Sequence, residues 1–160
     1  MSGTRRRWLI AAAVIAWLAG ATSGQAAGPG GPDSFARGAS GFRGAAQRSK
    51  ASGKPLFLYF YTDWCGYCRQ FERELLSSEA VIRALQQFEV AAINPESGDD
   101  EAAVGDSYGI QSFPTLLVQT PGPRGPVRLR RSIDDGGSQR LMNPEEFVRA
   151  LNAAAAAARD

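Results

Sequence analysis

The sequence predicts one α/β domain in which helices flank a central mixed sheet of four to five strands. Three observations support this fold class. Residues 56–61, LFLYFY, form a continuous apolar run, which is typical of a strand buried on both faces. In residues 127–133 one set, Val127, Leu129, Arg131 and Ile133, alternates with a polar set, Arg128, Arg130 and Ser132, as in an antiparallel strand with one wet face. Amphipathic helical patterns follow the first strand and end the chain, which at 160 residues is long enough for one hydrophobic core.

The first 26 residues are predicted to be a secretory signal peptide. Residues 5–7 are all arginine, and the apolar stretch 8–19 is too short to span a bilayer comfortably. Cleavage after Ala26 would leave Gly24 and Ala26 where a signal peptidase requires small side chains. A twin-arginine export signal and an uncleaved membrane anchor are alternatives that the residues leave open. In every case the domain lies outside the cytoplasm, so we expect a periplasmic protein.

Composition and charge exclude several functional classes. The chain has no histidine, which removes every Cys-His or Ser-His nucleophile pair and every histidine metal ligand. With only two cysteines, a tetrahedral zinc site would need two carboxylates, so we expect no metal and no cofactor. Three of the 18 basic residues lie in the predicted signal peptide, which leaves 15 against 16 acidic ones. This near balance of charge does not predict a basic surface that would bind nucleic acid.

The first half of the mature chain is predicted to hold a spacer, two helices and the central strand. Residues 27–40 are rich in Gly, Pro, Ala and Ser, and we expect a flexible linker there, before a domain spanning 41–158. A mildly helical stretch, 41–52, is ended by Gly53. The strand 56–61 then leads directly into an amphipathic helix, 66–76.

The second half alternates helices with shorter strands. Ser77 or Ser78 caps a helix that runs to residue 87, and Asn143, Pro144 and Glu146 form the start of the last helix. The alanine tail 153–158 is expected to fray. The remaining predicted elements are a strand at 90–93, a short helix at 102–108, a strand at 115–119, and a strand at 127–133 that forms a hairpin with the preceding one.

The strongest functional signal is the sequence Cys65-Gly66-Tyr67-Cys68, at the junction of the predicted strand and helix. A cysteine in the first turn of a helix lies near unpaired backbone N–H groups and the positive end of the helix dipole, and both favour thiolate over thiol. Cys65 is therefore the expected nucleophile, and Cys68, one turn further along, the resolving cysteine. A structural disulfide is the alternative, but a bridge that closes so short a loop removes little entropy from the unfolded chain.

The sequence resembles the thioredoxin superfamily, in particular its exported members akin to the C-terminal domain of the transmembrane thiol-disulfide interchange protein. The similar stretches are residues 54–81, KPLFLYFYTDWCGYCRQFERELLSSEAV, and residues 108–118, YGIQSFPTLLV. The resemblance implies a thioredoxin-like three-layer sandwich and a protein-disulfide oxidoreductase. It also implies a monomer whose partners are exported proteins with thiols or disulfides and a membrane electron donor or acceptor.

The resemblance assigns further site residues. Phe113-Pro114 corresponds to the family's cis-proline, which lies against the active cysteines and lets the preceding backbone pair with an extended substrate. Trp64, Gly66 and Tyr67 would shape the rim of the substrate-binding surface, and simple packing is an alternative role for Trp64.

The chain departs from thioredoxin at one buried position. Thioredoxin has an aspartate six residues before its first cysteine, where this chain has Tyr59, so Asp63 or Glu72 would have to assist proton transfer instead. We expect a periplasmic reductant of disulfides, while an oxidant stays open. A different class also stays open, namely a binding or chaperone module for cytochrome or metal-centre assembly that uses the disulfide as a switch.

Overall fold

The computed structural model describes residues 31–159. The predicted signal peptide, 1–26, and the first residues of the predicted linker lie outside the described residues. Five strands form one sheet in the order β1-β3-β2-β4-β5. These strands are β1 (Ala36–Arg37), β2 (Leu56–Phe60), β3 (Glu89–Ile93), β4 (Thr115–Gln119) and β5 (Val127–Leu129).

The central strand β2 is buried on both faces, as its unbroken apolar sequence predicts. It pairs in parallel with β3 and antiparallel with β4, and all five of its residues are buried. Phe57 and Tyr59 project into one hydrophobic cluster, while Leu56, Leu58 and Phe60 project into a second cluster on the opposite face. The sheet is therefore the middle layer of three.

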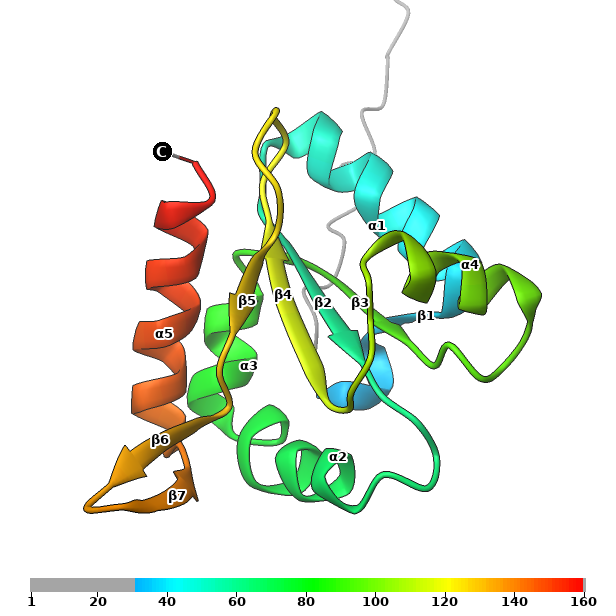
Figure 1. The fold of residues 1–160 in the computed structure, drawn as a ribbon. Coiled ribbons are helices and arrows are strands. Elements are labelled where there is room, and N and C mark those ends of the chain that lie inside the picture. The colour runs from blue at the N-terminus through cyan, green and yellow to red at the C-terminus, as the bar shows by residue number, and fades with distance from the viewer. Residues whose placement is uncertain (1–30, 160) are drawn as a thin grey trace, which may run out of the picture.

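Helices cover the two faces of the sheet (Figure 1). On the Phe60 face lie α1 (Gly38–Ser52) and α4 (Asp99–Ser107), which contribute Ala45 and Val104 to that cluster. On the Phe57 face lie α3 (Glu79–Leu85) and α5 (Pro144–Ala157), together with α2 (Gly66–Phe71) and the π-helical segment η2 (Glu72–Leu76) that continues it. This arrangement confirms the predicted thioredoxin-like three-layer α/β fold.

Helix capping follows the sequence. The Ser78 side chain accepts a hydrogen bond from the Val81 N–H at the start of α3. At α5, the Asn143 carbonyl oxygen accepts from the Glu146 N–H over 2.9 Å, and a Glu146 carboxylate oxygen accepts from the Asn143 N–H over 2.8 Å. This reciprocal pair is the predicted capping box. Within residues 31–159, no helix is both long and apolar enough to cross a membrane.

The structure differs from the predicted linker in residues 31–40. Residues Pro32–Ser34 form a 3-10 turn, η1, β1 pairs in parallel with β3, and α1 begins at Gly38 rather than at residue 41. Phe35 and Ala39 are buried in this segment. These two apolar side chains offset the ordering entropy of an otherwise small and polar stretch.

The predicted strand 127–133 is divided between two sheets. β5 ends at Leu129, and β6 (Ser132–Asp135) pairs instead with β7 (Ser138–Leu141), a strand that the sequence analysis did not predict. Asp135 and Ser138 face each other across Gly136 and Gly137, which both have positive φ. Such a two-residue turn favours glycine and closes a tight hairpin. The β6–β7 hairpin projects beyond the main sheet, next to α5 (Figure 1).

The alanine tail is helical where fraying was predicted. α5 continues through Ala157, and Ala154, Ala155 and Ala158 are buried. Alanine has the highest helix propensity, and here its small side chain also fits against the body of the domain. The tail is therefore part of the core packing.

Candidate functional site

The two cysteines lie where the central strand ends and a helix begins. β2 ends at Phe60, and Cys65 is the N-cap residue of α2. Cys65 and Cys68 form a disulfide with an S–S distance of 2.07 Å and a Cα–Cα distance of 5.2 Å. Three residues along one helical turn thus bring the two sulfurs together, as the spacing predicts.

The sulfur of Cys65 is placed where a thiolate would be stabilised. The backbone N–H of Cys68 donates to Cys65 Sγ over 3.0 Å, so the sulfur caps the helix. The first N–H groups of a helix carry partial positive charge, and a negatively charged sulfur there gains both a hydrogen bond and a favourable dipole interaction. Both effects lower the pKa of a thiol. This geometry supports Cys65 rather than Cys68 as the nucleophile.

The pair is recessed between two exposed aromatic residues. Cys65 is 3% exposed and Cys68 1%, whereas Trp64 is 67% and Tyr67 63% exposed. Within residues 31–159, Trp64 and Tyr67 are the large hydrophobic side chains that are exposed. Each ring is next to a cysteine in the chain, so we expect a partner bound at Cys65 to contact them.

One side of the rim is formed by Trp64 and Phe113, which come from separate parts of the chain. Their ring centroids are 6.2 Å apart in an edge-to-face arrangement, and the Trp64 indole Nε1–H donates to Glu96 Oε2 over 2.8 Å. Phe113 and Pro114 are half-buried, and the peptide bond between them is cis. The structure thus brings Phe113 beside the cysteine motif, and its role in binding substrate stays a prediction.

Gly66 is exposed between the rim residues and is not required by packing. A Cβ atom at this position would meet only Arg69 Nη2, at 3.9 Å. Arg69 itself donates to the backbone oxygen of Asp63 over 2.8 Å. Its guanidinium therefore stabilises the loop before the motif. The predicted substrate contact of Gly66 stays a prediction.

Beneath the pair, Tyr59 occupies the buried position that holds aspartate in thioredoxin. Its hydroxyl donates to Glu72 Oε1 over 2.9 Å and lies 3.4 Å from the carbonyl oxygen of Cys68. Burial, followed by the nearby Glu72 carboxylate, raises the pKa of Tyr59, so the hydroxyl stays protonated. Of the two acids considered from the sequence, Glu72 lies under the motif, whereas Asp63 is exposed. Glu72 is thus the better placed carboxylate.

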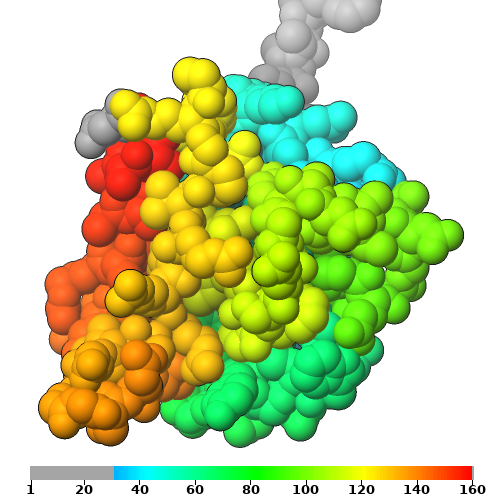
Figure 2. All heavy atoms as spheres, in the orientation of Figure 1, coloured from blue at the N-terminus to red at the C-terminus, as the bar shows by residue number. Residues whose placement is uncertain are grey.

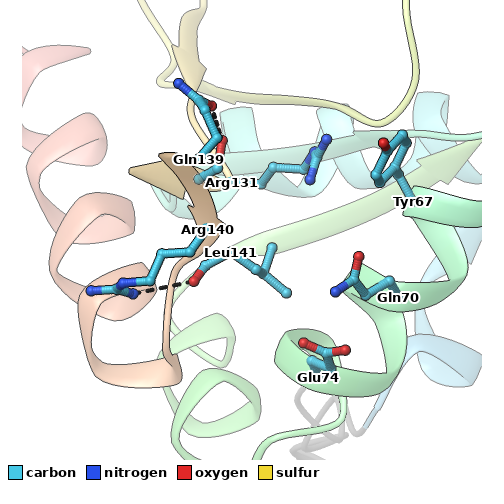
Figure 3. A pocket seen from close by; sticks show the side chains of 8 residues that line it. Tyr67, Gln70, Glu74, Arg131, Gln139, Arg140 and Leu141 are labelled. Carbon is cyan, nitrogen blue, oxygen red and sulfur yellow. Dashed lines mark hydrogen bonds between the residues drawn. The ribbon is translucent and has the colours of Figure 1, made fainter. Parts of the chain in front are cut away.

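One side of the site could not be predicted from the sequence, namely the β6–β7 hairpin and Arg131, which directly precedes β6. The Arg131 guanidinium carbon lies 4.8 Å from the centre of the Tyr67 ring, a cation–π contact. Between the hairpin and the α2–η2 helix lies a cleft of about 530 Å³ (Figure 3). The adjacent glycines at 136 and 137 are a local signal that could have indicated a hairpin, but no local signal places that hairpin beside Tyr67.

Within residues 31–159, no cluster of three or more cysteines and acidic side chains could hold a metal ion. The two cysteine sulfurs are bonded to each other. A disulfide between two cysteines three residues apart can be formed and broken by thiol–disulfide exchange.

Comparisons with known proteins agree with this geometry. A family model described as thioredoxin-like matches residues 39–121. A thioredoxin of Streptomyces clavuligerus is 37% identical over 71 residues, which cover 44% of this chain and 61% of that protein. The thiol:disulfide interchange protein DsbD 1 of Pseudomonas aeruginosa is 29% identical over 79 residues, which cover 49% of this chain and 13% of that protein.

A solved structure of the Neisseria meningitidis DsbD C-terminal domain in the oxidised form superimposes with a TM-score of 0.57. It is 17% identical and the match covers 75% of this chain and 98% of that domain, so it supports the fold. The matches span between 13% and 61% of the length of these curated relatives.

Proposed function

The chain belongs to the thioredoxin-like family, and on that basis we propose that it is a thiol-disulfide oxidoreductase that exchanges disulfides with other proteins. The observation that carries the proposal is the position of the Cys65–Cys68 disulfide at the start of α2, where Cys65 Sγ accepts the Cys68 N–H over 3.0 Å. A structural bridge has no need of a sulfur at a helix N-terminus. A nucleophile does, because its thiolate must form at neutral pH.

The exchange proceeds in two balanced steps. The reduced Cys65 thiolate attacks one sulfur of a partner disulfide, forms a mixed disulfide and releases the first partner thiolate. The Cys68 thiol loses its proton and attacks Cys65 Sγ, which releases the second partner thiolate and forms the Cys65–Cys68 disulfide. Two electrons pass from the cysteine pair to the partner. We assign the proton of Cys68 to Glu72, the carboxylate that accepts a hydrogen bond from Tyr59 under the motif.

The direction that we propose is reduction of the partner. Strongly oxidising pairs owe their potential to a strongly stabilised thiolate. Here Cys65 Sγ receives one backbone N–H, and among residues 31–159 no cationic side chain donates to it. Arg69 donates to the Asp63 carbonyl oxygen instead. Moderate stabilisation of this kind favours a potential closer to about −270 mV than to about −120 mV.

The proposed location is the periplasm, and the proposed partners are exported proteins with thiols or disulfides. Support comes from the three arginines and the apolar stretch of residues 5–19. A reductant outside the cytoplasm needs a supply of electrons, so a membrane protein is the proposed donor. Cell fractionation with N-terminal sequencing tests this, and a mature chain that begins at Ala27 is the expected product.

Two serine variants form a matched pair for testing the exchange chemistry. Cys65→Ser and Cys68→Ser both remove the disulfide, so they differ only in which sulfur is left. Reduction of insulin by dithiothreitol should be accelerated by the wild-type protein and by neither variant. Cys68→Ser should accumulate covalent mixed disulfides with exported proteins, because the resolving step is blocked, and Cys65→Ser should not. Equal trapping by the two variants would contradict the assigned roles.

The alternative of a redox-switched binding module predicts a different outcome for the same variants. Its affinity for a partner depends on the surface around the motif and not on electron transfer. A partner complex that forms with full affinity in Cys65→Ser, together with no insulin reduction by the wild-type protein, would favour that module over the oxidoreductase.

A further inference from the structure

A polar cleft lies directly beside the redox pair. It begins at Tyr67, the residue before Cys68, and lies between the α2–η2 helix and the β6–β7 hairpin (Figure 3). In Figure 2 the hairpin, in orange, forms a projecting corner next to the green surface of that helix. Two further hollows, of about 330 and 170 Å³, contain no residue of α2 or the hairpin. The cleft is thus a hollow that lies next to the cysteine motif, because Tyr67 belongs to both.

One wall of the cleft is a single face of the helix. Tyr67, Gln70 and Glu74 are spaced three and four residues apart, so their side chains project from the same side (Figure 3). Seven residues of helix span about 10 Å, which is the length of about three residues of extended chain. The wall therefore has the length of a short peptide segment that continues from the reacting cysteine.

Two arginines line the opposite wall, and they differ in whether a carboxylate of the domain neutralises their charge. Arg140 donates to both carboxylate oxygens of Glu146, over 2.8 and 2.7 Å, and to Asp135 over 3.2 Å. The charge of Arg140 is thus balanced within the domain. Arg131 forms no ion pair with any described residue. Its guanidinium makes a cation–π contact with the face of the Tyr67 ring.

The contact with Tyr67 orients the Arg131 charge without using its hydrogen-bonding capacity. An aromatic ring face attracts a cation electrostatically, but it leaves the N–H groups free to donate to a carboxylate. Guanidinium has five N–H donors in a planar fork, which matches a carboxylate in a bidentate arrangement. In Figure 3 the Arg131 side chain extends toward Tyr67, at the end of the cleft next to the cysteine motif.

We propose that this cleft is a specificity subsite for the partner polypeptide, in which Arg131 binds a carboxylate next to the partner's reacting cysteine. The inference rests on the proposed function and adds the kind of partner that the site selects. The occupant is an extended segment that begins at the cysteine bonded to Cys65 and runs along the helix wall. Glu74, at the far end of that wall, favours a basic residue about three positions further along the segment.

The experiment compares two peptides that differ only in charge. Each carries one cysteine as a mixed disulfide with 2-mercaptoethanol, flanked on both sides by Asp in one peptide and by Lys in the other. The second-order rate of reduction is measured by rapid quench with the reduced wild-type protein, Arg131→Glu and Arg130→Glu. Arg130 is exposed and adjacent in sequence, so its variant is a control with the same change in net charge. The readout is the ratio of the two rates within each protein, which cancels any change in overall activity.

The wild-type protein should reduce the Asp peptide about two- to fivefold faster than the Lys peptide at low salt, as expected for one exposed ion pair. The ratio should approach one in high salt, invert in Arg131→Glu and stay above one in Arg130→Glu. Equal wild-type rates, or the same ratio in both variants, would overturn the subsite. Bis(2-hydroxyethyl) disulfide, which is small and uncharged, separates the two proposals. If the wild-type protein does not reduce it, the proposed function fails, whereas if it does and the peptides react equally, only the subsite fails.

Discussion

Replacing Tyr59 by phenylalanine should destabilise the domain without disturbing the packing around the cysteines. The Tyr59 side chain is 1% exposed, and its hydroxyl donates to Glu72 Oε1 over 2.9 Å. A hydrogen bond to a charged group contributes about 1.5–3 kcal/mol, and water can partly replace it at the half-buried Glu72. We therefore expect a loss of about 1–2 kcal/mol in the free energy of unfolding. The ring keeps its stacking on Tyr61 and its tilted contact with Phe71.

Urea unfolding followed by circular dichroism measures this effect. With an m-value of about 1.5 kcal/mol/M, the midpoint should fall by roughly 1 M, with an unchanged slope. Tyr61→Phe is the matched control, because this neighbouring hydroxyl accepts its bond from Arg37 near the surface. Its midpoint should shift by less than about a third of that amount. If the urea midpoint of Tyr59→Phe equals that of the wild-type protein, or if both variants shift equally, the Tyr59–Glu72 hydrogen bond is not a source of stability.

Two further predictions concern the last helix. The Arg140 side chain and the Asn143 N–H lower the pKa of Glu146 to about 2 from an ordinary 4.5, so its stabilising contribution is present above pH 4.5 and lost as the pH falls toward 2. Urea midpoints measured across this range should therefore fall less steeply for Glu146→Gln than for the wild-type protein, and parallel profiles would contradict the ion pair. Ala155→Asp places a charge at a site that is 5% exposed and should cost more than about 3 kcal/mol, whereas the exposed Ala153→Asp should cost less than about 1 kcal/mol. Equal thermal stability of these two variants would indicate that the tail frays.

The parts of the fold that the sequence predicts are those with a strong local signal. The short continuous apolar run of β2 is typical of a strand in the middle of a sheet, and the Asn143–Glu146 capping box joins residues only three apart. The cysteine spacing likewise predicts a sulfur at a helix N-terminus. In each case neighbouring residues carry the whole physical cause.

The parts that the sequence did not predict depend on contacts between distant segments. β1 is two residues long in a small-residue stretch, and it exists because β3 offers it a partner. The alternating pattern of 127–133 does not show that Leu129 belongs to the main sheet while Ile133 belongs to the hairpin. The alanine tail lacks the large side chains that usually mark a buried helix face.

In the candidate site, too, the residues that are adjacent in sequence were predictable and the contacts between distant segments were not. Trp64, the two cysteines and Tyr67 are adjacent in sequence, and their grouping was predictable. The resemblance to the thioredoxin superfamily, rather than any pattern, suggested that Phe113 lies near the cysteines, but it did not predict the contact of Phe113 with Trp64. Arg131 could not be assigned, because its contact with Tyr67 depends on where the hairpin folds back.

The pH dependence of Cys65 alkylation tests the central claim most directly. The protein to use is the reduced Cys68→Ser variant, which keeps the backbone N–H that donates to Cys65 Sγ and leaves one thiol to react. If that sulfur is a nucleophile stabilised by the helix N-terminus, the rate of reaction with iodoacetamide should titrate with a midpoint clearly below the ordinary thiol pKa of about 8.5. A midpoint at or above that value, or a sulfur that does not react in the folded protein, would contradict the account.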